Sequence, residues 1–161
     1  MQTQLEVSMY QVSQVFLVPT LLLILALFFY AFWLLGHFAM LAWRRRRGGG
    51  RLLLARWRGE RGLTPDELDV YAHRLLEVPR IASRVTPMLG LVATMIPMGP
   101  ALQSLSGGNL GAVSENLTVA FSAVILALIA ASITFWVVNV RRRWLAEEML
   151  EVESLRRGSA A

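Results

Sequence analysis

The side chains that could do chemistry inside the apolar stretches of this sequence are hydroxyls. Thr94 lies in the middle of the second uncharged stretch, and Thr118 and Ser122 lie near the start of the third. A hydroxyl donates and accepts hydrogen bonds, so it can relay a proton to a carboxylate but cannot store charge. The competing interpretation is that each hydroxyl donates to a carbonyl of its own helix. We favour the relay for Thr94 and the helix bond for Ser122.

Charged side chains are missing from these stretches. No Asp, Glu, Lys or Arg lies within residues 15–43, 85–105 or 117–140, and Glu115 stands just before the third stretch. Ionisable groups inside a membrane mark ion and proton pathways. If this chain takes part in proton movement, a partner chain must supply the titrating group.

Metal, cofactor and enzyme chemistry find no support in the residue types. The chain has no cysteine, and its two histidines, His37 and His73, are isolated from each other in sequence. A chain without cysteine and with two isolated histidines does not have the ligand pattern of a metal site. The three uncharged stretches offer no carboxylate pair and no nucleophile with a base. We therefore expect no metal, no cofactor and no enzymatic activity.

The elements that would position these hydroxyls are transmembrane helices. Hydrophobic residues make up 55% of the chain and charged residues 17%, whereas a soluble domain carries about 25% charged residues. The uncharged run 15–43 is longer than a helix needs to cross a hydrocarbon core of about 30 Å. Residues 84–105 and 117–140 are also long enough. The sequence predicts an all-α integral membrane protein with three transmembrane helices and helical extensions.

The second span carries a continuous face of small and hydroxyl residues. The members of this small-residue stripe are Ser83, Pro87, Gly90, Thr94, Pro97, Ala101 and Ser104. Beside it runs a bulky row, made of Met88, Leu91, Met95, Met98 and Leu102. Three prolines suit this helix poorly to contact with lipid. We expect the stripe to line a central lumen or to meet a partner helix closely.

The third span has a small-residue stripe of its own, for which ordinary helix packing is the expected role. It consists of Ala120, Ala123, Ala127, Ala130 and Thr134.

A helix is also predicted within the polar segment between the first two spans. Thr64 and Glu67 have the spacing of a capping box, with Pro65 at the first helical position. We expect a helix over 65–78 that Pro79 bends or ends. Its predicted apolar face consists of Leu68, Tyr71, Leu75 and Val78.

The distribution of arginine predicts the topology. All 16 cationic residues are arginines, and all lie after the first span, at the mouth of the second or after the third. The positive-inside rule then places the N-terminus outside and the C-terminus in the cytoplasm of a multi-pass cell (inner) membrane protein. Such arginines also anchor helix ends at anionic lipid, so we assign no nucleic-acid role. The predicted segments are an outer N-terminus 1–14, a first span 15–43, a cytoplasmic loop 44–83, a second span 84–105, an outer hairpin 106–116, a third span 117–140 and a cytoplasmic tail helix 141–161.

Two segments resemble the MotA/TolQ/ExbB proton channel family. Residues 86–98 (TPMLGLVATMIPM) are similar to the second-helix signature of that family, and residues 113–117 (VSENL) resemble the start of its last helix. The resemblance implies a pentameric stator of a proton-driven motor. Its second and third helices would line a pore around single-pass partners of the MotB/TolR/ExbD type, whose aspartate carries the proton.

The resemblance also implies roles for individual residues. Thr94 matches the second-helix threonine near the partner aspartate, and Glu115 matches the glutamate that opens the last helix. Ala120 stands where the family has a last-helix threonine. The residues expected to line the proton path are Pro87, Gly90, Thr94, Pro97, Ala101, Glu115, Thr118 and Ser122. A non-conducting membrane scaffold or transporter accessory subunit is the alternative function.

Overall fold

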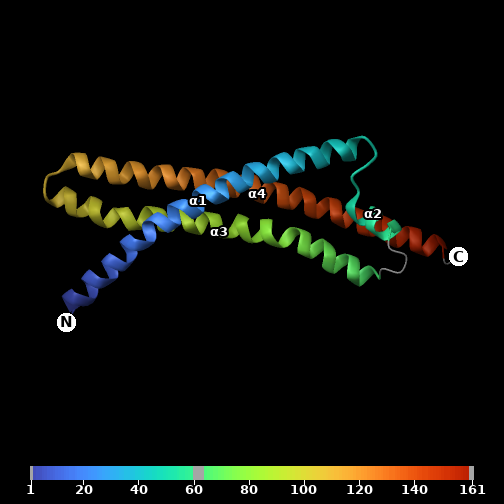
Figure 1. Ribbon diagram of the computed structural model, residues 1–161, viewed down its shortest axis with the longest axis horizontal. Helices are drawn as coiled ribbons and strands as arrows, with labels where there is room; N and C mark the ends of the chain where they lie inside the picture. The colour runs from blue at the N-terminus through green and yellow to red at the C-terminus, as the bar shows by residue number, and fades with distance from the viewer. Residues whose placement is uncertain (1, 60–63, 160–161) are drawn as a thin grey trace. The chain divides into compact units, whose positions relative to one another are not determined.

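The computed structural model describes residues 2–59 and 64–159, and these form helices joined by short connections (Figure 1). Residues 1, 60–63 and 160–161, which belong to the predicted N-terminus, loop and tail, lie outside the described residues. No strand occurs in the described part of the chain. The helices are α1 (Gln2–Arg46), α2 (Leu52–Gly59), α3 (Pro65–Ser106) and α4 (Leu110–Ser159).

Three of these helices are long and apolar enough to cross a membrane, as predicted. The candidate spans are Gln11–Arg46, Asp66–Ser106 and Leu110–Gly158. All three run past the predicted boundaries. In particular, α1 begins at Gln2 rather than near residue 15, and α4 joins the predicted third span and tail into one helix.

Of the two effects predicted for Pro79, ending the loop helix is wrong, because the helix predicted over 65–78 and the second span are one continuous helix, α3; bending stays a prediction. Proline removes one backbone hydrogen bond from a helix interior. Here Pro79 itself is buried, and so are Leu76 before it and Ala82 after it. Packing of the residues on both sides of the proline therefore compensates for the lost hydrogen bond and keeps the helix continuous.

Local capping explains where α3 begins. The backbone N–H of Thr64 donates to Glu67 Oε2 at 2.8 Å, and the backbone N–H of Glu67 donates to Thr64 Oγ1 at 3.3 Å. This is the predicted capping box, in which two otherwise unpaired donors are satisfied reciprocally. The hydrogen bonds lower the pKa of the Glu67 carboxyl, first through the backbone of Thr64 and then through its hydroxyl, while desolvation opposes them.

A tight turn joins α3 to α4. Gly108 has a φ of 75°, and the backbone N–H of Asn109 donates to the carbonyl of Ser104 at 2.9 Å. Glycine adopts positive φ without the steric cost that a side chain would bring. The Asn109 side chain then caps α4, because its Oδ1 accepts from the N–H of Ala112 at 3.2 Å.

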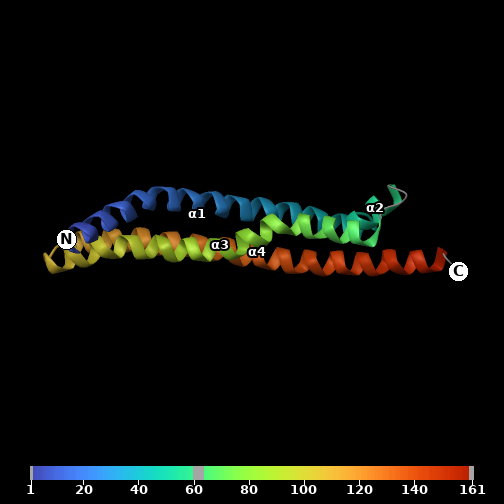
Figure 2. The same cartoon turned by 90° about the horizontal axis from the view of Figure 1, so that it is seen from below.

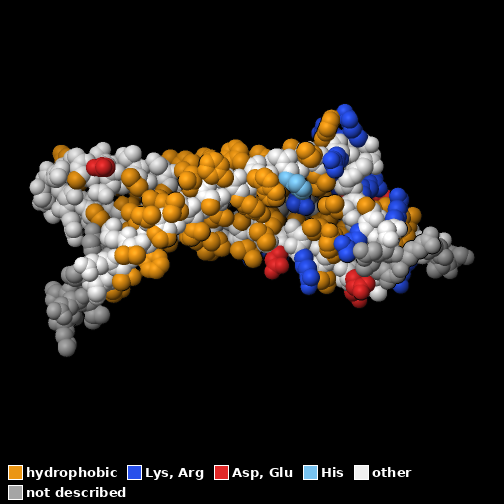
Figure 3. Space-filling model, in the orientation of Figure 1, with side chains coloured by type: hydrophobic (Ala, Val, Ile, Leu, Met, Phe, Trp, Pro, Cys, Tyr) orange, Lys and Arg blue, Asp and Glu red, His pale blue; other side chains and the backbone are white. Residues whose placement is uncertain are grey.

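The chain divides into two compact units. Unit 1 comprises Met1–Phe32 and Ser83–Ser132, and unit 2 comprises Trp33–Ala82 and Ile133–Ala161. Of the 16 arginines, only Arg84 belongs to unit 1. Apolar side chains dominate the visible surface of unit 1, and the cationic side chains appear on unit 2 (Figure 3).

Apart from Ile24, the core of unit 1 is built from small side chains. Within this unit α3 and α4 run side by side in both ribbon views (Figures 1 and 2). Its buried members are Ile24, Ala93, Ala123 and Ala127. The predicted third-span stripe is buried along its whole length, from Ala120 at 2% exposed to Thr134 at 2%. Small residues let helix backbones approach closely, so this stripe packs as expected.

Unit 2 has a core of larger aliphatic side chains from α2, α3 and α4, namely Leu53, Leu54, Leu68, Ala72, Leu76, Leu145 and Val152. The predicted apolar face of the loop helix is wrong at one position, since Val78 is 62% exposed. The buried row on α3 instead follows Leu68, Ala72 and Leu76, which are four residues apart. Positions separated by four residues lie on one face of a helix, which directs Val78 away from this core.

Candidate functional site

The predicted path residues divide into a buried group and an accessible group. Gly90, Pro97 and Ala101 are buried within the chain, whereas Pro87 and Thr94 are half-buried at the edge of the same stripe. The predicted stripe therefore supplies close packing inside the single chain and leaves its hydroxyl edge accessible. The bulky row beside it is exposed over its whole length, at fractions between 50% and 66%.

At Gly90 α3 lies very close to α4 in unit 1. A Cβ atom built on Gly90 would lie 2.8 Å from Ala127 Cβ and 3.4 Å from Val124 Cγ2. Cβ atoms do not come within 3.0 Å of other carbons in real proteins, so a larger side chain at position 90 would push the helices apart. Gly90 thus sets the spacing of the pair of helices that carry the candidate hydroxyls.

Each candidate hydroxyl donates to its own helix. Thr94 Oγ1 donates to the carbonyl of Leu91 at 2.7 Å, Thr118 Oγ1 to that of Ser114 at 2.8 Å and Ser122 Oγ to that of Thr118 at 2.8 Å. These are the helix bonds that competed with a relay in the sequence interpretation. A hydroxyl that has donated its proton still accepts through its oxygen, so these side chains can receive a hydrogen bond from a protonated carboxyl group.

On α4 the accessible hydroxyls form a row. Thr118 and Ser122 are exposed, and Ser114 precedes them by one further turn. Sequence analysis missed Ser114, although its four-residue spacing from Thr118 was visible. Glu115 is exposed beside this row. In the described part of the chain Thr94 forms no hydrogen bond with Thr118 or Ser122, so a single chain does not join the α3 and α4 hydroxyls into one hydrogen-bonded cluster.

A buried carboxylate in unit 2 was also missed. Glu148 is 2% exposed, and its Oε1 accepts from Arg45 Nη1 at 2.8 Å while its Oε2 accepts from the backbone N–H of Leu53 at 2.8 Å. Glu148 therefore links the end of α1, the start of α2 and α4. Its position in a run of exposed acids gave no sequence signal, because burial of a single carboxylate depends on packing from distant segments.

Aromatic packing supports this link. The ring of Phe38 lies 5.0 Å from that of Trp144 and 5.2 Å from that of Trp136. The guanidinium of Arg45 lies 4.9 Å from the Trp144 ring, within the range of a cation–π contact. The C-terminal part of α1 is thus held to α4 by stacking and by charge.

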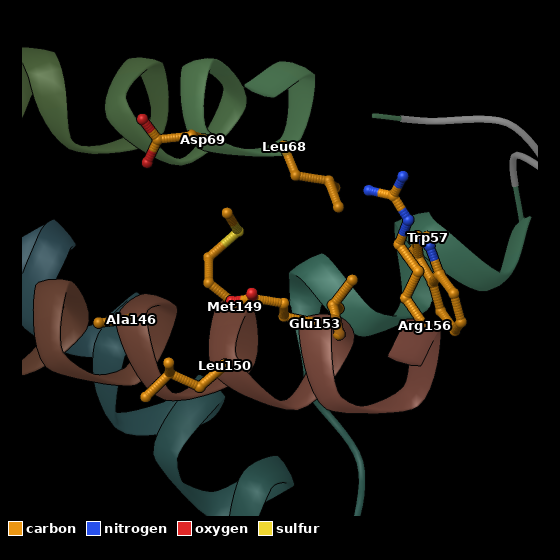
Figure 4. A pocket seen from close by; sticks show the side chains of 9 residues that line it. Trp57, Leu68, Asp69, Ala146, Met149, Leu150, Glu153 and Arg156 are labelled. Carbon is orange, nitrogen blue, oxygen red and sulfur yellow. The ribbon is translucent and has the colours of Figure 1, made fainter. Parts of the chain in front are cut away.

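Unit 2 also contains an apolar pocket of about 360 Å³ between α2, α3 and α4 (Figure 4). The labelled side chains include Leu68 from α3 and Met149 from α4, which extend from the two helices into the space between them. Asp69, Glu153 and Arg156 add charge to the lining. These groups include no nucleophile paired with a base, and no cluster of three or more metal-ligating side chains occurs in residues 2–59 and 64–159.

Comparison with known proteins adds one finding. Residues 68–154 match the family model described as MotA/TolQ/ExbB proton channel family, which covers more than half of the chain. The match takes in most of α3, the turn and most of α4, including all of its apolar part. No curated protein and no solved structure matches the chain.

Proposed function

The chain belongs to the MotA/TolQ/ExbB proton channel family, and from this membership we propose that it is a stator-type subunit of a motor driven by the proton-motive force. In this proposal several copies, five by resemblance to the family, form a ring in the cell inner membrane. The α3 and α4 helices surround a pore, and the single transmembrane helices of a MotB/TolR/ExbD-like partner occupy it.

The observation that carries this proposal is the combination of the family match with uncharged stretches long enough to cross a membrane. A transmembrane proton pathway needs a group that binds and releases the proton. The uncharged stretches of this chain contain hydroxyls but no carboxylate. In this proposal the partner supplies the aspartate that binds the proton, and copies of this chain form the ring around it.

The mechanism rests on the free energy of a carboxyl group at low dielectric. An ionised carboxylate is disfavoured there, whereas the protonated group is neutral and can move past apolar side chains. The exposed row from Met88 to Leu102 provides such a surface on α3. Thr94, at the edge of this row, can accept the hydrogen bond of the protonated aspartate. Thr118 and Ser122 on α4 offer acceptors of the same kind.

The buried residues of the stripe have a supporting role in this proposal. Gly90, Pro97 and Ala101 let α3 lie against its neighbours within the chain. They fix the backbone that carries Thr94 rather than contact the partner directly.

Proton flux into vesicles tests the proposal. The chain would be reconstituted with a co-purifying single-pass partner in liposomes that enclose a pH-sensitive dye, and a pH gradient would be imposed. We expect flux with both chains present, and none with this chain alone or with the partner aspartate changed to asparagine. A complex that binds its partner stably yet conducts no protons would instead be a scaffold or accessory subunit.

Copy number gives an independent test of the ring. Native mass spectrometry of the complex in detergent counts the subunits directly. We expect five copies of this chain with a smaller number of partner chains. A lone copy of this chain in every condition would contradict a pore built between subunits.

A further inference from the structure

Unit 2 has a second cavity, which is more polar than the first and lies where the chain turns from α1 into α2. Its volume is about 400 Å³, and it is lined by the glycines 48–50 and by Arg51, Leu54, Ala55 and Arg58. Arg51, Leu54, Ala55 and Arg58 occupy positions i, i+3, i+4 and i+7, so they fall on one face of α2 and the turn before it. The cavity thus combines exposed backbone of a glycine turn with two guanidinium groups and an apolar wall.

The charge around this cavity is strongly positive. Seven arginines and no acidic residue occur between residues 44 and 58. Arg45 pairs with Glu147 and Glu148, and Arg51 pairs with Glu151 at 2.6 Å. Among the described residues, no ion pair is found for Arg44, Arg46 or Arg58. The acidic residues of α4 that pair with these arginines therefore neutralise only part of the positive charge around the cavity.

In a membrane-inserted chain we expect this cavity at the depth of the lipid headgroups. The uncharged run of α1 ends at Trp43, only five residues before Gly48. The guanidinium of Arg47 lies 3.9 Å from the centre of the Trp43 ring. Tryptophan and arginine at a helix end are typical anchors of the membrane interface. A cationic cavity at this level meets phospholipid phosphates before any soluble anion, because headgroups are concentrated there.

We propose that this cavity binds the headgroup of an anionic phospholipid of the phosphatidylglycerol type. The lipid phosphate contacts Arg58 and the face of Arg51 that Glu151 leaves open, and the glycerol portion lies against Leu54 and Ala55. The glycines keep the mouth of the cavity free of side chains. Basic pockets beside transmembrane helices are a recurring form of anionic lipid site. The proposal depends on membrane insertion alone and not on proton conduction.

Two substitutions of Gly49 test whether the lipid binds in this cavity. Gly48 and Gly50 have positive φ values of 82° and 81°, so a side chain there would strain the turn. Gly49 lacks this restriction, and a Cβ atom on it would meet only the Arg44 carbonyl oxygen, at an ordinary 3.7 Å. Gly49→Glu places a carboxylate at the cavity, and Gly49→Ala is the matched control for the change of backbone and size.

A second pair of variants distinguishes binding in the cavity from an effect of the protein's net charge. Arg58→Gln removes a lining cation, and Arg74→Gln removes one from α3 outside the cavity lining. Both changes lower the net charge by one. A general attraction between the protein and anionic lipid would respond equally to the two variants, whereas a site would respond only to the first.

Native mass spectrometry of delipidated full-length protein in detergent measures the bound lipid after addition of phosphatidylglycerol or phosphatidylcholine. We expect preferential retention of phosphatidylglycerol, reduced about fivefold by Arg58→Gln, the effect of one arginine near an anionic surface. Gly49→Glu should reduce retention at least as far, and Gly49→Ala and Arg74→Gln should retain wild-type levels.

Three results would overturn the proposal. Equal retention of the two lipids would show that the cavity does not select a negative headgroup. Equal losses in Arg58→Gln and Arg74→Gln would show general charge attraction. Displacement of the lipid by inorganic phosphate at the same concentration would assign the cavity to a soluble anion.

Discussion

Glu148 and Arg45 form a charge-assisted hydrogen bond in the interior of unit 2, with 2.8 Å between Oε1 and Nη1. The second carboxylate oxygen accepts from the backbone N–H of Leu53. Hydrogen bonds to ionised groups are roughly twice as strong as neutral ones. One side chain of α4 thereby fixes both the end of α1 and the beginning of α2.

Removing this carboxylate should destabilise unit 2. Glu148→Ala leaves a largely buried guanidinium without its main partner and the Leu53 N–H unpaired, so we expect a loss of about 2–3 kcal/mol in the free energy of unfolding. The midpoint of an SDS titration of the protein in mild detergent, followed by circular dichroism, measures it.

The neighbouring acid is the control for this prediction. Glu147 also reaches Arg45, at 3.1 Å, but its side chain is 55% exposed. Exposed ion pairs contribute about 0–1 kcal/mol, so Glu147→Ala should have a small effect. Equal losses in the two variants would show that burial of Glu148 does not matter.

Gly90→Ala should disturb the contact between α3 and α4 in unit 1. The added Cβ lies 2.8 Å from Ala127 Cβ, and overpacking of this kind costs about 1–3 kcal/mol. Ala127→Gly removes the opposing atom, so the double variant should recover most of the lost stability. A double-mutant cycle on the same SDS titration measures this coupling.

A glycine of α1 provides the comparison. A Cβ on Gly36 meets no atom within 4 Å, so Gly36→Ala should cause no loss. If Ala127→Gly failed to rescue Gly90→Ala, the close approach at Gly90 would not be the cause of the destabilisation.

Thr94→Val should reduce proton flux with the partner by up to about tenfold, since a hydrogen bond between neutral groups, here Thr94 and the protonated aspartate, is worth about 0.5–1.5 kcal/mol. Valine has a similar shape but cannot accept a hydrogen bond, so assembly should be preserved. Thr94→Ser restores the acceptor and should conduct. The liposome flux assay and native mass spectrometry, used together, separate conduction from assembly.

Ser132 offers a matched control for Thr94. Its hydroxyl also donates to its own helix, at 2.8 Å to the Leu128 carbonyl, but it lies outside the predicted path. Ser132→Ala should conduct normally. Wild-type flux in Thr94→Val would remove Thr94 from the pathway.

Thr64→Ala should raise the pKa of Glu67 part of the way toward its ordinary value, because the variant removes the hydroxyl of Thr64 and keeps its backbone N–H, the larger of the two causes that lower this pKa. A lowered pKa in the folded state stabilises the first turn of α3 above the ordinary pKa of glutamate, and this stability is lost as pH falls through the lowered value. The variant should therefore show a weaker pH dependence. A carboxyl carbon NMR titration of Glu67 and hydrogen exchange of the first turn of α3 measure these effects.

Glu77 lies on the same helix away from the cap and serves as the reference. Glu77→Gln should leave the titration of Glu67 unchanged. A Glu67 pKa that did not move in Thr64→Ala would mean that the hydroxyl of Thr64 does not help to lower it.

The sequence by itself determined the features that depend on neighbours along the chain. Uncharged length predicts the three spans, and the Thr64–Glu67 spacing predicts the start of α3. Helical periodicity predicts the alanine stripe of α4, because residues three and four apart share a face whatever lies opposite.

Only the tertiary structure decided which groups meet across the chain. Periodicity placed Gly90 and Thr94 on one face but could not show that the first is buried against Ala127 while the second stays at the edge. It could not single out Glu148 either, whose partners are 103 and 95 residues away. Pro79 stays inside a helix because the residues around it pack against the rest of unit 2, and that packing outweighs the local cost of one hydrogen bond.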